Sequence, residues 1–563
     1  MKKEKKILYI VILIVITILL SLPIVSNTFN CYIGEGINYI SKSYELSKIG
    51  VFSNIIPSFA NNFGYINSIF NNRFPDILLA ITNLVFKNPI TSFKLLEVIT
   101  LFISGITMYC LVKEISENRN IGILAAGIYM MLPYHLTEIY VRNAFSEHLA
   151  LAILPITFLG LYSLKNNERK HYLFPISLAL MFMCDRSLSW IVFGISIIYL
   201  LVNIKEIKNN KILSKVILSF AFILILTACI WLPYFEATIG EDYKINNVTN
   251  EEIQGFSRQT ISIRKLFVTA QKENYVFEVG PLLIAMFALT PMAFVKLKNE
   301  YKKDYITYLI FCILGFICAT SIFSINIFAR IFVKLQFPWR ILTLANFFLT
   351  IVCAINMGAI VGNLKLKDSL ILLVVSMAYI ICLSGHIQNT ENLTDIENME
   401  LGNISGKVDE ISAGINKAEY LPTKAYYNKF YIATRTQEMC VLEGKALIEN
   451  ENKNGSEYSA KVKTFEEQTK FELPYIYYPG YVVKEDGITL ESIETENGFL
   501  GFVLGANDDA KIEVTYQKSN LEQIANIISI ISLIAFVIYA VGVNKEENSK
   551  YRFKIDMSHV NWK

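Results

Sequence analysis

Long apolar runs alternate along the chain with two kinds of polar segment. The apolar runs lie near residues 7–24, 95–112, 121–133, 149–164, 173–184, 188–204, 215–233, 281–296, 306–323, 339–361, 368–384 and 523–543. A helix rises about 1.5 Å per residue, so roughly 20 apolar residues cross a bilayer. Some runs are shorter, and such helices pack in pairs or line wet cavities. The pattern predicts a polytopic α-helical membrane protein with about 12 transmembrane helices.

The polar segments between these runs differ in charge. One kind is short and lysine-rich, and it occurs at residues 2–6, 165–172, 205–211 and 296–305. Short loops rich in Lys and Arg stay in the cytoplasm. The other kind holds isolated charged and aromatic residues at helix ends, at 138–148, 184–190 and 335–342, and falls on the extracytoplasmic face. With many Ile, Asn and Lys residues, typical of an AT-rich bacterial genome, this predicts a bacterial cytoplasmic membrane protein with both termini in the cytoplasm.

Three longer segments are predicted to lie outside the membrane. They are the outer loops 25–94 and 234–280 and the polar segment 385–522. Within the last, β-branched and aromatic runs at 471–483, 498–505 and 510–516 are separated by Gly, Pro, Asn and Asp, which is typical of strands. The predicted domains are therefore a multi-span domain at 1–384, an extracytoplasmic β-rich domain at 385–522, a final transmembrane helix at 523–543 and a cytoplasmic tail at 544–563.

Composition narrows the class of protein. Hydrophobic residues make up 53% and charged residues 18%, and the mean hydropathy is +0.40, beyond what a soluble chain of this length shows. The net charge of +3 gives no argument for nucleic-acid binding. No Walker A loop, Rossmann glycine fingerprint, HExxH or GxSxG motif occurs. The absence of these motifs argues against ATP hydrolysis and against a nucleotide-activated donor.

The nine cysteines form no CxxC pair and no disulfide framework. Most lie inside apolar runs, where a cysteine behaves as a small hydrophobic residue. Cys31 and Cys440 both fall in predicted outer segments, which leaves a bridge between them open.

Charged residues gather just before the apolar run at 149–164. Glu138 and Arg142 are four residues apart and can pair on one helix face, and Asn143 and Glu147 repeat that spacing one step round. Such a helix end can be a simple interfacial anchor. Two such pairs directly before an apolar run favour an anion-binding or substrate-positioning element. Polar groups in a membrane are costly, and several of them at one depth therefore suggest a functional site.

Two further arginines lie at predicted outer helix ends. Arg186 stands in a charged break between two apolar runs, and Arg340 follows Pro338 and Trp339 at a predicted helix start. A guanidinium presents a planar fork of donors to phosphate oxygens. The alternatives are a turn between helices for Arg186 and an interfacial Trp–Arg anchor for Arg340.

These arginines share the outer face with the carboxylates Glu35, Glu138, Glu147 and Glu236. That set suits an anionic lipid-linked substrate with a carboxylate acting as general base. No ligand spacing indicates a metal site, and the sequence leaves a divalent-metal requirement open.

Several segments resemble the YfhO-like bacterial integral membrane proteins of the GT-C glycosyltransferase superfamily, whose relatives are often labelled 6-pyruvoyl-tetrahydropterin synthase-related. The similar segments are 134–150, 154–164, 335–342, 418–423 and 473–483. The resemblance runs over nearly the whole chain and implies a GT-C-like fold. It implies transfer of a sugar from a polyprenyl-phosphate carrier, the lipid-linked donor, to an envelope glycopolymer or lipid acceptor, such as a teichoic acid, outside the cell.

The chain departs from the family pattern at the expected base. The first outer loop of such proteins carries a Gly-His-Asp…Phe-His pattern; here Gly34 matches, Glu35 replaces the first His, Gly36 falls on the Asp and Ile40 on the second His. Arg186 stands where a later His is expected. The positions that do match are Arg142, Asn143 and Glu147.

The sequence therefore leads to a membrane glycosyltransferase hypothesis with Glu35, or else Glu147, as the catalytic carboxylate. The expected substrate contacts are Arg142, Asn143, Arg186, Arg340 and Glu138. The alternative is a catalytically silent GT-C relative that acts as a binding or scaffold protein in envelope assembly. A lipid-linked oligosaccharide transporter is disfavoured, because it would place polar residues deep in several spans rather than at their outer ends.

Overall fold

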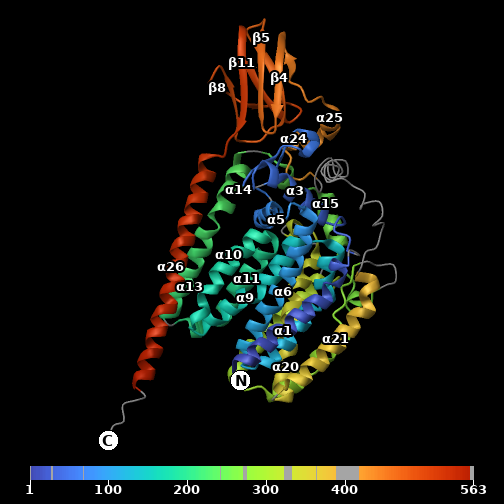
Figure 1. Cartoon of the computed structure of the whole chain (residues 1–563), viewed down its shortest axis with the longest axis vertical. Coiled ribbons are helices and arrows are strands. Elements are labelled where there is room, and N and C mark those ends of the chain that lie inside the picture. Colours follow the sequence, from blue (N-terminus) through green and yellow to red (C-terminus); the bar gives the residue numbers. More distant parts are fainter. Residues whose placement is uncertain are drawn as a thin grey trace.

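The apolar runs form a bundle of helices that carries a β-rich region at one end (Figure 1). The structure is a computed structural model, and it describes residues 2–26, 29–67, 69–70, 72–208, 210–240, 242–269, 275–322, 332–362, 364–387 and 418–557. Part of the predicted outer segment, residues 388–417, and the last six residues of the predicted tail lie outside the described residues.

Each predicted apolar run contains a helix or a broken pair of helices. The bundle consists of α1 (Lys2–Leu20), α6 (Pro89–Ser116), α7 (Arg119–Met130), α9 (Phe145–Lys165), α10 (Leu173–Cys184), α11 (Arg186–Val202), α13 (Asn210–Leu226), α14 (Ala228–Gly240), α16 (Pro281–Ala288), α17 (Thr290–Lys296), α18 (Asn299–Ala319), α20 (Leu342–Val361), α21 (Leu366–Ile387) and α26 (Asn520–Met557).

The predicted number of about 12 membrane spans is not confirmed. By length and composition, five helices of the described residues can cross a membrane: Pro89–Ser116, Phe145–Lys165, Pro338–Val361, Leu366–Ser384 and Asn520–Val543. A sixth span results if α13 and α14, which meet at a 58° bend, are counted as one broken crossing. The difference arises because several apolar runs form helices too short to span alone, such as α7 and α10 with 12 residues each.

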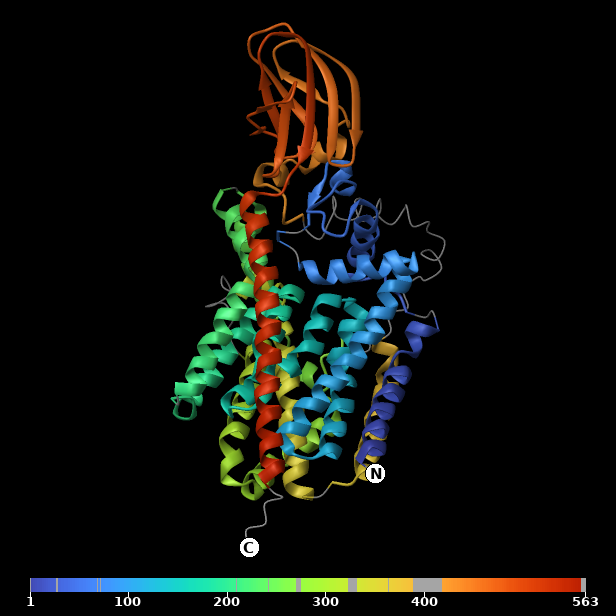
Figure 2. The same cartoon turned by 60° about the vertical axis from the view of Figure 1, so that its left-hand side comes forward.

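Shorter elements connect and cover the bundle. They are α2 (Leu22–Val25), α3 (Gly36–Ile49), α4 (Phe59–Asn62), α5 (Arg73–Phe86), α8 (Pro133–Thr137), η1 (Glu138–Arg142), η2 (Arg169–Tyr172), α12 (Ile204–Ile207), η3 (Lys244–Asn246), α15 (Asn250–Arg258), η4 (Ile263–Leu266), η6 (Val333–Leu335), η7 (Pro338–Ile341), α24 (Thr423–Tyr427) and α25 (Lys429–Thr434). In Figure 2, α5 lies across the end of the bundle that faces the β-rich region.

The β-rich region contains two antiparallel sheets. Its strands are β3 (Cys440–Glu443), β4 (Ala446–Asn454), β5 (Glu457–Thr464), β6 (Thr469–Ile476), β7 (Tyr481–Glu485), β8 (Ile488–Leu490), β9 (Ile493–Glu494), β10 (Phe499–Leu504) and β11 (Asn507–Tyr516). One sheet has the order β3-β6-β10-β9 and the other β4-β5-β11-β7-β8. Buried and outward residues alternate along β5, as a strand with one face in a core requires. Apolar residues of both sheets share one core.

The segment 25–94, which the sequence predicts as the first outer loop and which keeps that name below, packs into that same core. Its two short strands, β1 (Ile55–Ile56) and β2 (Tyr65–Ile66), pair with each other. The Ile476 N–H donates to the Phe63 carbonyl at 3.0 Å, and the Phe63 ring meets the Phe499 ring edge-on at 5.1 Å. The loop therefore joins the β-rich region to the bundle and lies over the end of the bundle where the candidate residues gather.

The last helix links both parts of the molecule. α26 runs from the β-rich region along α14 and α13 to the opposite end of the bundle (Figures 1 and 2). α1 begins at that same far end. α26 also continues to Met557, beyond the end at residue 543 that the hydropathy pattern predicts.

The bridge between Cys31 and Cys440 that the sequence left open is not formed. All nine cysteines are free thiols. Cys31 is buried beside the turn that precedes α3, whereas Cys440 begins β3 of the β-rich region.

Candidate functional site

The segment from Pro133 to Phe145 reverses the chain and brings several charged residues together. α8 begins at Pro133, where a missing N–H costs nothing, and passes directly into η1, a five-residue π-helix. Asn143 then adopts a left-handed conformation with φ of 51°, which Asn tolerates better than most residues. α9 starts at Phe145, and its first turn carries Glu147 back toward η1. π-helical turns of this kind occur often at functional sites.

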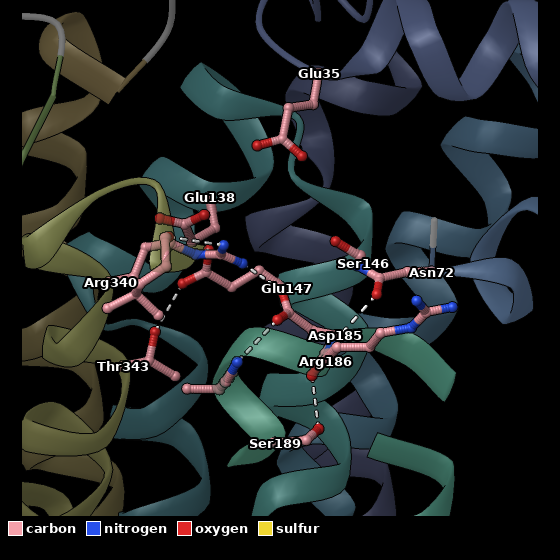
Figure 3. A network of polar contacts seen from close by, with 12 residues as sticks. Glu35, Asn72, Glu138, Ser146, Glu147, Asp185, Arg186, Ser189, Arg340 and Thr343 are labelled. Carbon is pink, nitrogen blue, oxygen red and sulfur yellow. Dashed lines mark hydrogen bonds and ion pairs between the residues drawn. The ribbon is translucent and has the colours of Figure 1, made fainter. Parts of the chain in front are cut away.

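Arg142 contacts the carboxylates of Glu35, Glu138 and Glu147. Figure 3 labels these three acidic residues. Its Nη1 donates to an oxygen of Glu138 and, at 2.6 Å, to Oε2 of Glu147. Its Nη2 donates to Oε1 of Glu35 at 2.9 Å. The pairing of Glu138 with Arg142 that the spacing predicts is therefore present, although the backbone between them is a π-helix rather than an α-helix.

Arg340 approaches the same cluster from the start of the helical segment at 338–361. Its Nε donates to Oε2 of Glu147 at 2.8 Å, and its Nη2 donates to a carboxylate oxygen of Asp185. The other Glu147 oxygen accepts from Thr343 Oγ1 at 2.9 Å and from the Tyr134 hydroxyl at 3.1 Å. Glu147 is thus the centre of the network, because it joins the two guanidinium groups.

The first outer loop brings Glu35 to Arg142 by a close backbone approach. The Glu35 N–H donates to the Arg142 carbonyl at 2.8 Å. Gly34 has φ of +58°, and a Cβ there would lie 2.1 Å from that carbonyl oxygen. A Cβ at Gly36 would lie 2.1 Å from the Cys31 carbonyl oxygen. Glycine is required at both positions for Glu35 to reach the network.

Asn143 holds the same loop from the other side. Its Nδ2 donates to the carbonyls of Asn30 and Ile33, both at 3.0 Å. Asn143 therefore contacts main chain and fixes the path of the loop that carries Glu35.

The side chains of the network are buried, with the exception of Glu35. Glu138 and Glu147 are fully buried, and Arg142 and Arg340 nearly so. The Glu35 side chain remains 27% exposed. Four acidic side chains, those of Glu35, Glu138, Glu147 and Asp185, face the two guanidinium groups of Arg142 and Arg340, so the cluster holds more acidic than basic groups. Burying such groups is expensive, and only close pairing with hydrogen bonds offsets that cost. Glu35 is the member that a molecule from outside can reach.

An aromatic cluster covers one side of Arg142. The Arg142 Cζ lies 4.8 Å from the ring centre of Trp339 and 5.5 Å from that of Phe337. These two rings stack on each other at 4.7 Å. A guanidinium over aromatic faces gains a cation–π attraction, so the aromatic pair restricts Arg142 further.

Arg186 lies at the edge of this arrangement. Its N–H donates to Asn72 Oδ1 at 3.2 Å, and its Nη1 donates to the carbonyls of Ile69 and Phe70 at 2.9 and 3.3 Å. The preceding residue, Asp185, caps α11 by accepting from the Leu188 N–H at 2.9 Å. Asp185 thus joins the network through Arg340, while Arg186 ties the start of α11 to the first outer loop.

The structure therefore brings together Glu35, Glu138, Arg142, Glu147 and Arg340, with Asn143 beside them and Arg186 apart. Glu236, which shares their predicted face, lies elsewhere and accepts from the Ser519 hydroxyl. Sequence reasoning missed Asp185, Tyr134 and Thr343. Asp185 carries a detectable signal, because an Asp directly before an apolar helix is a typical N-cap.

No metal cluster marks the network in the part of the chain that the structure describes. No group of three His, Cys, Asp or Glu residues among the described residues is arranged to hold a metal ion. An apolar cavity of about 40 Å³ lies elsewhere, between residues such as Met131, Pro133, Pro281 and Tyr379.

Apolar helices long enough to span a bilayer, with a buried ionic network at one end of the bundle, define a polytopic membrane protein. Residues 72–390, more than half of the chain, match the family described as 6-pyruvoyl-tetrahydropterin synthase related domain; membrane protein. The chain belongs to this family.

Comparison with solved structures adds a structural likeness. No curated protein sequence matches the chain. Among solved structures, the chain is similar to the arabinofuranosyltransferase AftD from Mycobacteria, with 14% sequence identity and a TM-score of 0.46 over 69% of this chain and 27% of that one. The chain thus spans little more than a quarter of the length of that protein.

Proposed function

We propose that the protein is a membrane glycosyltransferase of the GT-C type. It moves a sugar from a polyprenyl-phosphate carrier to a glycopolymer or lipid acceptor of the cell envelope, on the outer face of the cytoplasmic membrane, with both termini in the cytoplasm. Support for this orientation comes from the lysine-rich loops of the sequence. Support for the class comes from the resemblance to YfhO-like proteins, which extends over nearly the whole chain.

The observation that carries the proposal is the ionic network with its single half-buried carboxylate. Glu35 reaches Arg142 from the first outer loop and remains 27% exposed, whereas the Arg142 side chain is only 3% exposed. A carboxylate at the rim of a buried guanidinium cluster is suited to accept a proton from a substrate hydroxyl. The guanidinium beneath it is suited to a phosphate oxygen.

In the proposed reaction, the donor phosphate displaces the Glu35 carboxylate from Nη2 of Arg142. Glu35 then accepts the proton of an acceptor hydroxyl, whose oxygen attacks the anomeric carbon. The bond from that carbon to the carrier phosphate oxygen breaks, and the polyprenyl phosphate leaves with the electron pair. The displacement matters because three acidic side chains already contact Arg142, so a phosphate is favoured when it replaces one of them.

The other residues of the network have supporting roles in this proposal. Glu147 is fully buried and contacts both Arg142 and Arg340, so it orients the two guanidinium groups rather than acting as the base. Glu138 holds Arg142 through the same Nη1 atom that contacts Glu147. Arg340 and Asn143 fix Glu147 and the first outer loop. Arg186 is proposed as a headgroup contact at the edge of the site.

Complementation of a deletion strain tests the proposal. Glu35→Gln keeps the shape of the side chain and removes its basicity, and we expect transfer of sugar to envelope polymer to fall by about 10²–10⁴-fold. Glu251→Gln changes an exposed carboxylate of α15 and serves as the matched control. Membrane abundance of each variant is measured by immunoblot. Normal envelope glycan with Glu35→Gln would remove Glu35 from the mechanism.

A second candidate is a catalytically silent relative that binds or scaffolds envelope-assembly proteins. It is favoured by the hydrogen bonds of Glu147, whose two carboxylate oxygens accept from two arginines, a threonine and a tyrosine. A carboxylate with so many donors is typical of a residue that stabilises the fold. On this alternative, deletion of the protein leaves the envelope glycan unchanged and alters the composition of a complex purified from the membrane.

A further inference from the structure

A second buried polar cluster, formed by Glu97, His135 and His148, lies beside Glu147. His148 is the next residue of α9, and its Nδ1 contacts the Glu97 carboxylate of α6. The His148 ring also meets the His135 ring of α8 edge-on, with centres 5.1 Å apart. All three side chains are at most 1% exposed. The proposed mechanism uses none of them.

The hydrogen bonds define where protons lie in this cluster. His135 Nδ1 is 3.0 Å from the Tyr129 carbonyl, and a carbonyl only accepts, so Nδ1 of His135 carries a proton. Between His148 Nδ1 and Glu97 Oε2 there must likewise be one proton, whichever atom holds it, because two lone pairs would repel at contact distance. The remaining atoms, Glu97 Oε1 and Nε2 of both histidines, have no hydrogen-bond partner among the described residues.

Stability does not explain why such a pair is kept in the bundle. An ionisable pair inside an apolar region is costly, and apolar residues of similar size would be neutral or stabilising there. The pair instead fixes the orientation of the first turn of α9. One hydrogen bond between Glu97 of α6 and His148 of α9 determines how that turn is rotated about the helix axis.

That turn needs such a fixed rotation. The residue before it, Ala144, offers no side-chain cap to the helix end. The Ser146 N–H donates to the Tyr39 hydroxyl at 3.3 Å, a long contact. Successive residues of a helix point about 100° apart, so the direction of His148 determines the direction of Glu147.

We propose that Glu97 is a positioning residue for Glu147 and acts through His148. The proton shared by Glu97 and His148 locks the first turn of α9, and this keeps Glu147 between Arg142 and Arg340. Tyr140 of η1, whose hydroxyl donates to the Leu20 carbonyl, and His135 complete the surroundings of the pair. The inference rests on the proposed role of the Glu147 network, but its test requires no sugar transfer.

The test is a double-mutant cycle on the purified full-length protein in detergent. Glu97→Leu removes the hydrogen bond, Glu97→Gln retains it, and each is combined with Glu147→Gln. We expect the midpoint temperatures of Glu97→Leu and Glu147→Gln to be non-additive by about 2 °C or more, while Glu97→Gln restores most of the wild-type behaviour. The control cycle pairs Glu97→Leu with Glu472→Gln in the β-rich region, where additivity is expected.

A spectroscopic measurement separates positioning from simple packing. Nitrogen-15 NMR of labelled histidine, with the His148 signal assigned from His148→Gln, reports on the proton at Nδ1. We expect that signal to shift in Glu147→Gln, although these two side chains do not touch, and to stay unchanged in Glu472→Gln. Additive changes in midpoint temperature for Glu97→Leu and Glu147→Gln would overturn the proposal. A His148 signal that does not shift in Glu147→Gln would overturn it as well. Either result is independent of whether Glu35→Gln abolishes transfer.

Discussion

Replacing Arg340 with Met is the most direct perturbation of the ionic network. The change removes the ion pairs to Glu147 and Asp185 while keeping most of the apolar stem. Glu147 keeps Arg142, Thr343 and Tyr134, but Asp185, which is 1% exposed, is left with the Leu188 N–H among the contacts of the described residues. Leaving a buried charge without its partner costs about 3–5 kcal/mol. That is a large part of a typical free energy of unfolding of about 5–15 kcal/mol.

The loss is measured by reversible denaturant titration in detergent micelles, followed by tryptophan fluorescence. Trp339, one of the four tryptophans of the chain, lies next to Arg340, so part of the signal reports on the network. Lys303→Met is the matched control, because it removes a cation from an ion pair with Glu206 in which both side chains are about 40% exposed. We expect that control to change stability by at most about 0.5 kcal/mol.

Arg340→Lys adds a second measure of the geometry. A lysine keeps the charge but has one ammonium group where the guanidinium serves Glu147, Asp185 and the Leu335 carbonyl. We expect a loss between those of the wild type and Arg340→Met. If Arg340→Met costs less than about 1 kcal/mol, the carboxylates around it are not held as buried charges and the electrostatic reasoning is wrong.

Two further predictions concern the loop that carries Glu35 and the β-rich region. Gly34→Ala would place a Cβ 2.1 Å from the Arg142 carbonyl oxygen at φ of +58°, so we expect thermal unfolding to show a loss of more than about 1 kcal/mol, whereas Gly194→Ala in α11, with open space around its Cβ, should be neutral or stabilising. Burial raises the pKa of Glu472, but donors from Thr495, Asn497, Tyr431 and Arg435 outweigh it and lower the pKa below the ordinary 4.5. The unfolded state then binds more protons in acid, so stability that is complete above that value is lost as pH falls through the folded pKa; denaturant titrations at several acid pH values should show this loss, and Glu472→Gln should flatten it.

Hydropathy predicted the bundle well because an apolar run in a membrane protein has few alternatives to a helix. The breaks within runs could not be predicted in the same way. The run at 215–233 bends near Thr227, between α13 and α14, and the run at 281–296 is interrupted near Leu289. The second break lies just before Pro291, and a proline interrupts a helix, so that break carries a sequence signal. The first falls at Thr227 with no proline beside it, and there tertiary packing rather than composition decides the backbone path.

The outer regions were predicted less completely. The strands β6, β7, β10 and β11 follow apolar and aromatic runs, but β4 (ALIENENKN) is mostly exposed and polar, so its sequence resembles a loop. The packing of the first outer loop into the core of the β-rich region was also not predicted. The residues in contact, such as Phe63 and Phe499, lie hundreds of positions apart in the sequence.

For the candidate site, residue spacing within one segment predicted a side-chain contact, whereas the spacing between distant segments predicted none. Glu138 and Arg142 pair as their four-residue spacing predicts. Glu147 contacts Arg142, five residues away, instead of Asn143, with which the spacing had matched it. The link from Arg340 to Glu147 and Asp185 joins three distant helices, and nothing in a single sequence encodes it. The roles proposed for Glu35 and the arginines remain predictions that the variants above test.

The π-helical turn at η1 makes the length of this segment as important as its composition. Inserting or deleting one residue between Pro133 and Arg142, where α8 passes directly into η1, would rotate the side chains that follow in η1 by about 100°. Arg142 would then point away from Glu147. Homologous chains that keep the network should therefore keep the number of residues in this turn, even where individual side chains have changed. An alignment gap at this point would identify a relative that has given up the site.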